Sequence, residues 1–348
     1  MSEQTASQGT NRQWVLKSRP NGEPRVENFE LRESPVPAVE EGEVLRRTLY
    51  LSLDPYMRGR MSEGPSYASP AELGEPMVGA TVSQVVQSRN PAYADGDYVL
   101  GYDGWQEYGV SDGNGLRKLD PADGPLSYAL GALGMPGLTA YAALLRIGDP
   151  KAGETVVVSA AAGAVGSLVG QIAKIKECRT VGLAGSDDKC RFVVETLGFD
   201  DCINYKTADL DSALKTACLD GIDIYYDNVA GPILAAVLGQ INLHARIPLV
   251  GLISQYNATT PPAGPNLMPL LVKRARIEGF LVGDHQDMAS QFHAEMAGWI
   301  KAGRIEPQED IVDGLENAPQ AFLGLFTGSN LGKLIVRVGA GPDDLAAF

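Results

Sequence analysis

The most constraining feature of this 348-residue chain is a strand, a glycine turn and a helix that follow one another between residues 154 and 176. An apolar, β-branched run at 154–159 is followed by the small-residue turn Ala-Ala-Ala-Gly-Ala-Val-Gly at 160–166. A second apolar run lies at 179–184. This order predicts a βαβ unit whose turn lets an anion approach the backbone, because small side chains leave the amides at a helix N-terminus open.

The turn matches the dinucleotide-binding pattern G-x-G-x-x-G at two of its three glycines. Ala161 stands in the first place, while Gly163 and Gly166 hold the second and third. The backbone from Gly163 through Ala164 and Val165 to Gly166 is therefore expected to face a pyrophosphate. The alternative is a glycine-rich turn without a ligand. The strand before the turn and the helix after it favour the dinucleotide site.

The end of the second strand indicates which dinucleotide is bound. NAD enzymes commonly carry a carboxylate there, which binds the ribose 2′-hydroxyl. Here the strand ends at Gly185-Ser186, and we interpret Asp187 and Asp188 as acids in the first turn of a helix that Ser186 caps. Lys189 is either a solvated lysine or a cation for a 2′-phosphate, and the residues alone leave these two interpretations even. Together these features favour NADPH.

Composition limits the classes of function. Lys and Arg number 29 against 43 Asp and Glu, and the net charge of -14 argues against binding to nucleic-acid phosphates. The length of 348 residues predicts two domains, and a hydrophobic fraction of 44% with 21% charged residues is typical of a globular enzyme. Residues 1–13 lack a signal-peptide pattern and no apolar stretch reaches spanning length, so we expect a cytoplasmic protein without a membrane partner. The cysteines and histidines have no metal-ligand spacing, so no metal is expected.

The order of predicted elements indicates an α/β chain with two domains. Between about residues 14 and 110, short alternating strands at 43–52, 77–86 and 98–100 are separated by Pro and Gly, which is typical of a mostly β domain. From residue 129 onward, strands and helices alternate as in a doubly wound parallel sheet. The strands are predicted at 155–159, 180–184, 201–205, 222–226 and 245–250, and the helices at 130–145, 164–176, 187–197 and 208–218. We predict a mostly β domain at 1–128, a Rossmann domain at 129–304 and a segment at 305–348 that returns to the first domain.

Eight short motifs occur in order along the chain. They are DPYMRGRM at 54–61, MPGLTAY at 135–141, SAAAGAVGS at 159–167, AGSDDK at 184–189, NYK at 204–206, DNV at 227–229, GLISQYN at 251–257 and GSNLGK at 328–333. With them the chain resembles the zinc-independent branch of the medium-chain dehydrogenase/reductase superfamily, specifically the group of prostaglandin reductase, leukotriene B4 dehydrogenase and bacterial curcumin reductase. The resemblance implies a Rossmann domain, a distorted-barrel (GroES-like) catalytic domain, a cleft between them, NADP(H) as cofactor and no metal. Members of the group are dimers or monomers, and strand addition between Rossmann domains favours a homodimer.

The same resemblance assigns roles to individual residues. It implies that Lys189 and Tyr205 hold the 2′-phosphate, which favours the functional interpretation of Lys189. Hydroxyl, amide and phenol groups suit the phosphate, ribose and carboxamide oxygens of a dinucleotide. The remaining cofactor-binding candidates of this kind are Thr139, Ser186, Asn228, Ser254, Tyr256 and Asn330.

The expected chemistry follows from the missing metal ligands. Without zinc to polarise a carbonyl, hydride delivery is expected to a carbon that conjugation has made electrophilic. We therefore predict an NADPH-dependent oxidoreductase of the CH-CH class, an enone or alkenal reductase that takes a small unsaturated ketone or aldehyde. An NADPH quinone oxidoreductase and a non-catalytic NADP-binding protein with a sensing or structural role are the alternatives.

Tyr56 is the candidate catalytic residue, because a phenol offers both a flat apolar face and a hydroxyl. It is predicted either to donate a proton or to line the substrate cleft, and a tyrosine packed at the edge of the barrel is the structural alternative. Tyr56 and Tyr256 are the two candidate substrate-binding residues.

Overall fold

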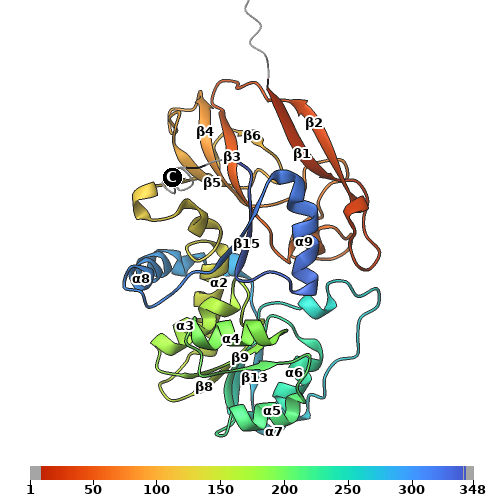
Figure 1. Ribbon diagram of the computed structural model, residues 1–348, viewed down its shortest axis with the longest axis vertical. Coiled ribbons are helices and arrows are strands. Elements are labelled where there is room, and N and C mark those ends of the chain that lie inside the picture. The colour runs from red at the N-terminus through yellow and green to blue at the C-terminus, as the bar shows by residue number, and fades with distance from the viewer. Residues whose placement is uncertain (1–8, 340, 342–348) are drawn as a thin grey trace, which may run out of the picture. The chain divides into compact units, whose positions relative to one another are not determined.

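The computed structural model describes residues 9–339 and residue 341. The chain divides into two compact units. Unit 1 contains the described residues up to Leu130, Ile311–Ser329 and those from Leu334 onward; unit 2 contains Gly131–Asp310 and Asn330–Lys333. The chain thus leaves unit 2 after Asp310 and returns to it over Asn330–Lys333. Figure 1 labels many of the elements of both units.

Unit 2 is built on a six-stranded parallel sheet in the order β10-β9-β8-β11-β12-β13, so the predicted doubly wound sheet is confirmed. Its strands are β8 (Thr155–Ser159), β9 (Arg179–Ala184), β10 (Asp201–Asn204), β11 (Ile222–Tyr226), β12 (Ile241–Leu249) and β13 (Arg276–Gly279). Its helices are α2 (Met135–Ala143), α3 (Gly166–Ile175), α4 (Asp187–Glu195), α5 (Leu210–Ala217), α6 (Gly231–Leu238), α7 (Met268–Lys273) and α8 (Ala289–Lys301).

Strand β8 shows why this sheet forms. Val156 and Val158 belong to one hydrophobic cluster and Val157 to the other, so both faces of the strand are buried. A strand of this kind is expected to be a continuous apolar run rather than an alternating one. On one of these faces β8 shares a cluster with Val169 and Ile172 of α3, the amphipathic helix that the glycine turn introduces.

Several predicted boundaries in unit 2 are wrong. The helix predicted from residue 130 begins only at Met135. The helix predicted from residue 164 begins at Gly166, because 164 and 165 are still part of the turn. The strand predicted from residue 245 begins at Ile241. His244 has a left-handed φ of 62°, and the register of β12 against β11 shifts along the pair. This irregularity breaks the alternation that strand prediction uses.

The order of the strands predicts where a ligand binds. β8 and β11 are neighbours although two strands lie between them in sequence, so the direction of winding reverses at this pair. Ligands of such sheets bind outside the carboxyl ends of the strands at this switch point. Ser159 ends β8 there, and Asp227 and Asn228 follow β11.

Unit 1 is mostly β, as predicted. A seven-stranded sheet has the order β14-β15-β3-β4-β5-β7, with β6 paired to β3, and β1 and β2 form a separate pair. The elements are β1 (Thr10–Leu16), β2 (Phe29–Pro35), β3 (Val44–Ser52), α1 (Met57–Arg60), β4 (Thr81–Ser88), β5 (Tyr98–Gly101), β6 (Tyr108–Ser111), β7 (Arg117–Leu119), β14 (Glu309–Asp313), α9 (Ala318–Thr327) and β15 (Lys333–Arg337). The strand predicted from residue 77 begins only at Thr81, since the amide of Met77 bonds the Trp14 carbonyl instead.

The core of unit 1 combines aromatic packing with a buried ion pair. The rings of Phe29 and Trp105 stack with centroids 5.2 Å apart, and Phe322 meets Trp105 edge-on at 5.5 Å. Arg46 and Asp103 form an ion pair whose side chains are almost fully buried. A buried pair of this kind holds its strands in one register only if its remaining hydrogen-bonding groups are satisfied. Among the described residues, no helix is long and apolar enough to cross a membrane.

Candidate active site

The turn after β8 has the geometry of an anion cradle. Ala160 adopts a left-handed φ of 50°, which is rare for a residue with a side chain, and its carbonyl accepts the Gly163 amide at 2.9 Å. A Cβ on Gly166 would lie only 2.3 Å from the Ala160 carbonyl oxygen. The tight turn therefore requires glycine at this position, and it brings backbone rather than side chains to the start of α3.

The amides of this turn are available to a ligand. Helix α3 starts without a side-chain cap. Within the part of the chain that the structure describes, the backbone amides of Ala164, Val165 and Gly166 donate to no protein acceptor. Three such amides at the positive end of a helix dipole suit a pyrophosphate. The predicted turn residues thus lie together in a geometry that fits a dinucleotide.

A second group of residues gathers where β9 and β10 end. Tyr205 follows β10, and its amide donates to the Ala184 carbonyl at 3.1 Å. A Cβ on Gly185 would lie 3.0 Å from the Tyr205 hydroxyl and 3.2 Å from Cε of Lys206. Glycine at the tip of β9 therefore leaves room for a phenol and a lysine beside it. No carboxylate stands at Gly185 or Ser186, the positions where an NAD enzyme would place one.

Lys189 points into the same region from α4. Its Nζ donates to the Asn330 carbonyl at 2.5 Å, and the side chain is partly buried. Burial, and after it the charge of Lys206, lower the pKa of Lys189. The charge of Asp310 acts in the opposite direction, but the net pKa of Lys189 remains lowered. The cluster of Lys189, Tyr205 and Lys206 therefore fits the 2′-phosphate of NADPH.

Ser186, which the sequence predicts both to cap a helix and to bind the cofactor, has the capping contact in this structure. Ser186 caps α4, because its Oγ accepts the Lys189 amide at 3.3 Å. Asp187 and Asp188 lie exposed in the first turn, and Asp187 accepts the side chain of Asn204 at 2.7 Å. These contacts hold the start of α4 against the end of β10.

The switch point between β8 and β11 is organised by Asp227. Its Oδ1 accepts the Tyr225 hydroxyl at 2.8 Å and the amides of Val229 and Ala230 at 2.9 and 2.8 Å. The Ser159 hydroxyl lies 3.3 Å from the same oxygen. Burial raises the pKa of Asp227, although these donors act against the increase. This carboxylate fixes the backbone that carries Asn228.

Asn228 and the residues after β12 lie around this switch point. Nδ2 of Asn228 donates to the Ser159 carbonyl at 2.8 Å, which leaves its Oδ1 as the acceptor to offer a ligand. Ser254 Oγ donates to the Val229 carbonyl at 2.5 Å, and the Tyr256 hydroxyl accepts the Leu252 amide at 3.5 Å. Ser254 is therefore tied to the Asn228 loop, whereas the hydroxyl of Tyr256 turns back to its own loop.

Thr139 and Asn330 complete the predicted set in unit 2. Oγ1 of Thr139 donates to the Met135 carbonyl at 2.7 Å, so this hydroxyl offers a ligand an acceptor rather than a proton. The Asn330 side chain donates to the Gly332 carbonyl at 3.0 Å. Gly332 in turn donates its amide to the Ala162 carbonyl at 2.8 Å, so residues 330–333 run beside the glycine turn.

Tyr56 belongs to unit 1, at the residue before α1. It packs against the cluster that contains Met57 and Trp105 but remains partly exposed. Burial, and after it the charge of Asp54, raise the pKa of Tyr56 far above its usual value. The hydroxyl therefore keeps its proton throughout the neutral range, which makes it a hydrogen-bond donor.

Three residues of this region were not assigned from the sequence. They are Ser159, Lys206 and Asp227, and all lie at or just after the carboxyl end of a strand. That position was the available signal, because strand ends at a switch point line the ligand crevice. Lys206 also follows Tyr205 directly, within a motif already recognised.

Replacing Asp227 with alanine is expected to lower the free energy of unfolding by about 2–4 kcal/mol, because the amides of Val229 and Ala230 and the buried Tyr225 hydroxyl lose their acceptor. Urea denaturation followed by circular dichroism measures this loss. The matched control is Asp220→Ala, which removes an exposed carboxylate and is expected to change stability by less than about 0.5 kcal/mol. Equal stability of the two variants would contradict the role assigned to Asp227.

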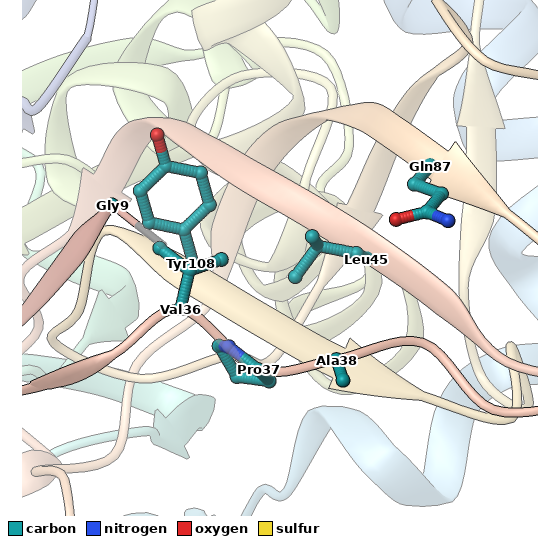
Figure 2. Close-up of a pocket in the computed structure, with 7 residues that line it drawn as sticks. All are labelled: Gly9, Val36, Pro37, Ala38, Leu45, Gln87 and Tyr108. Atoms are coloured by element: carbon teal, nitrogen blue, oxygen red, sulfur yellow. The ribbon is translucent and has the colours of Figure 1, made fainter. Parts of the chain in front are cut away.

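A surface hollow in unit 1 does not contribute to this site. Figure 2 shows its lining, formed by Gly9, residues 36–38, Leu45, Gln87 and Tyr108. The lining is mainly apolar, and none of these residues belongs to the predicted site. We assign it no chemistry.

Comparison with known proteins identifies the family. Residues 12–119 match the family described as the N-terminal domain of oxidoreductase, and residues 164–298 match the zinc-binding dehydrogenase family. The chain is 54% identical to the NADPH-dependent curcumin reductase of Escherichia coli (strain K12), with 96% of this chain and 98% of the relative covered. The chain belongs to the curcumin reductase and alkenal reductase family of medium-chain dehydrogenases/reductases. The resemblance seen in the motifs is confirmed.

Other members of this family agree with that placement. The NADP(+)-dependent 2-alkenal reductase of Nicotiana tabacum is 45% identical, with 96% of this chain and 99% of the relative covered. The crystal structure of CurA from Vibrio vulnificus in complex with NADPH is 50% identical, with a TM-score of 0.91 over 95% of this chain and all of that chain.

The zinc-binding description of one matching family does not fit the residues of this chain. Among the described residues, no three His, Cys, Asp or Glu side chains gather where they could hold a metal ion. The four cysteines are free thiols, and the three histidines lie apart in the sequence. No step of the reaction is therefore assigned to zinc.

Proposed function

We propose that this protein is an NADPH-dependent reductase of the C=C bond of α,β-unsaturated ketones and aldehydes. Two anion-binding features of unit 2 carry the proposal. One is the set of open amides at the glycine turn, and the other is the cluster of Lys189, Tyr205 and Lys206 beside the ends of β9 and β10. Its full-length similarity to curcumin and 2-alkenal reductases supports the choice of substrate class.

The residues of unit 2 would hold the cofactor at several points. The amides of Ala164 to Gly166 bind the pyrophosphate, and the cationic cluster binds the 2′-phosphate. Thr139 accepts the carboxamide N–H, while Asn228, Ser254 and Asn330 line the path between the two ends. When bound, NADPH supplies a hydride to the β-carbon of the unsaturated carbonyl, and negative charge develops on the carbonyl oxygen.

Tyr56 is proposed to stabilise the negative charge that develops on the carbonyl oxygen. A neutral phenol can donate a hydrogen bond to the enolate oxygen, which stabilises the developing charge without a metal. Its raised pKa suits this task, because the proton remains in place at neutral pH. Tyr256 is proposed to contribute its ring to the substrate site, since its hydroxyl already bonds within its own loop.

The variant Tyr56→Phe is expected to lower kcat about tenfold, as for the loss of one hydrogen bond to a charged oxygen. Because the pKa of Tyr56 is raised, the proton-bearing form is present below and through pH 9, so kcat of the native enzyme should be level from pH 7 to 9 as far as Tyr56 is concerned. Initial rates with an enone and NADPH measure both effects. Tyr98→Phe removes a phenol hydroxyl elsewhere in unit 1 and serves as control. Equal rates for the two variants would remove Tyr56 from the mechanism.

A substrate panel tests the function itself. Enals, enones and quinones are each assayed with NADPH and with NADH, and products are identified by mass spectrometry. We expect rapid NADPH oxidation with enals or enones, products two hydrogens heavier, and much weaker activity with NADH. Turnover of quinones without alkene saturation would favour a quinone reductase, and tight NADPH binding without turnover of any substrate would favour a sensing role.

We also propose a homodimer formed at strand β13. This strand is one edge of the six-stranded sheet, and all four of its residues are exposed. Apolar side chains lie exposed on and beside it, among them Leu271 at 73% and Ile277 at 38% exposure. An edge strand with exposed apolar side chains is a template for pairing with a second copy about a two-fold axis.

Sedimentation velocity tests the dimer. The double variant Leu271→Asp with Ile277→Asp should sediment as a monomer, because four charges would meet at the paired edge. The control Leu219→Asp changes an 85% exposed leucine outside this edge and should remain dimeric. A native chain that sediments as a monomer would contradict the proposal.

A further inference from the structure

Two of the four cysteines form a close thiol pair. Cys190 lies in α4 and Cys202 in β10, and Sγ of Cys202 donates to Sγ of Cys190 at 3.0 Å. Both side chains are partly exposed, whereas Cys178 and Cys218 are buried. The sulfur atoms of a disulfide are about 2.05 Å apart, so an approach of about 1 Å would join this pair.

The pair lies directly beside the cofactor cradle. Cys190 follows Lys189 in the chain, and its amide donates to the Ser186 carbonyl at 3.0 Å. On β10, Cys202 comes shortly before Tyr205, and a Cβ on Gly182 of β9 would lie 3.1 Å from its sulfur. The two sulfurs therefore link the first turn of α4 to the strands whose ends carry the cationic cluster. Figure 1 shows α4 beside β9 in unit 2.

We propose that Cys190 and Cys202 are a modification site, which a hydroperoxide oxidises to a disulfide, and that this disulfide weakens NADPH binding at Lys189 and Tyr205. The second part rests on the proposed function. Joining the sulfurs draws α4 toward β10 and moves Lys189 relative to Tyr205. A phosphate held by charge-assisted hydrogen bonds is sensitive to such a displacement.

The chemistry balances with the peroxide as the only oxidant. The sulfur of Cys190 attacks one oxygen of the hydroperoxide, an S–O bond forms and the O–O bond breaks. The other oxygen takes the thiol proton and leaves as water from hydrogen peroxide, or as an alcohol from an organic hydroperoxide. The sulfur of Cys202 then attacks that of Cys190, the S–S bond forms, the S–O bond breaks, and water leaves. The two thiols lose two electrons and the peroxide gains them.

The order of attack follows from the contact between the sulfurs. Burial raises the pKa of both thiols, but the S–H of Cys202 that points at Cys190 lowers the pKa of Cys190 and raises that of Cys202 further. Cys190 therefore forms the thiolate more readily and attacks first. Because both thiols are mainly protonated at neutral pH, the oxidation is slow and requires sustained exposure to the oxidant.

Peptide mapping tests for the disulfide without reference to activity. The reduced protein is incubated with hydrogen peroxide, free thiols are alkylated, and trypsin cleaves after Lys189, Arg191 and Lys206. We expect a cross-linked product of the dipeptide 190–191 and the peptide 192–206, lighter by two hydrogens than its separate parts, that disappears after dithiothreitol treatment. Separate alkylation of Cys190 and Cys202 after peroxide treatment would overturn the proposal.

Cofactor affinity tests the second part. NADPH binding measured by fluorescence is expected to weaken about tenfold in the oxidised protein, as for one impaired hydrogen bond to a charged group, and to recover with dithiothreitol. The KM for NADPH should rise equally while kcat changes less than twofold. The variants Cys190→Ser and Cys202→Ser should keep their NADPH affinity after peroxide treatment. The control Cys218→Ser should lose affinity as the native protein does.

These readouts separate the two proposals. A disulfide that leaves NADPH affinity unchanged would overturn the link to the cradle. If oxidation still lowers NADPH affinity in Cys190→Ser, or no longer lowers it in Cys218→Ser, the assignment of the pair is overturned. If the reduced protein binds NADPH but reduces no enone, the proposed function fails, while the loss of NADPH affinity on oxidation still supports this inference.

Discussion

Replacing Lys189 with methionine is expected to raise the KM for NADPH about 30- to 140-fold and to leave the KM for NADH within about threefold. A hydrogen bond from a cation to a phosphate contributes about 2–3 kcal/mol, and each 1.4 kcal/mol is a factor of ten. Methionine keeps the length and apolar packing of the lysine stem while it removes the charge. Steady-state kinetics with one enone and each cofactor in turn measure the two KM values in the variant and in the native enzyme.

The control is Lys215→Met, which removes an exposed lysine of α5 and should change neither KM. The native enzyme offers a second test through pH. Because the pKa of Lys189 is lowered, its charge is lost at a lower pH than that of an exposed lysine, so the KM for NADPH should rise as pH increases toward 10. The Lys189→Met variant should lack this rise. A variant that loses NADPH and NADH affinity equally would contradict the assignment to the 2′-phosphate.

The second large effect is expected at the glycine turn. Gly166→Ala should lower kcat/KM for NADPH about 100-fold, because its Cβ would lie 2.3 Å from the Ala160 carbonyl oxygen and the backbone must move. Movement of the turn misaligns the three amides. The loss of one or two hydrogen bonds to a charged group accounts for a roughly 100-fold decrease in kcat/KM. The free energy of unfolding should also fall by about 1–3 kcal/mol.

A matched substitution separates this steric effect from the general effect of alanine in a helix. Gly298 lies in α8, where a Cβ would meet no heavy atom within 4 Å. Gly298→Ala should leave the kinetics unchanged and stabilise the chain by up to about 1 kcal/mol, since alanine favours the helix. Kinetics of Gly166→Ala that match those of the native enzyme would mean that the turn does not bind the cofactor.

The sequence predicted those parts of the site that a local pattern encodes. The turn at 160–166 lies between an apolar strand and an amphipathic helix, and the cap at Ser186 precedes two acids; both patterns are local and both are found in the structure. The position of Lys189 on α4 followed from the same cap. Its role as a phosphate cation did not, because a surface lysine has the same local sequence.

What the sequence did not predict depends on contacts between distant residues. The network around Asp227 joins β8 and β11, and the Gly332 amide reaches the Ala162 carbonyl across 170 positions of the chain. Nothing near Asp227 in the sequence marks it as the acceptor of two amides and two hydroxyls. The contact between Cys190 and Cys202 is likewise set by the packing of α4 on β10, which the spacing of the cysteines alone does not show.

The most direct test of the central claim, hydride transfer to the β-carbon, follows deuterium from the cofactor into the product. The enzyme is given an α,β-unsaturated ketone and NADPH that carries deuterium at both C4 positions of the nicotinamide, and the product is examined by nuclear magnetic resonance. The account predicts a saturated ketone with deuterium on the β-carbon and the carbonyl intact. Deuterium on the carbonyl carbon of an allylic alcohol, with the double bond preserved, would contradict it.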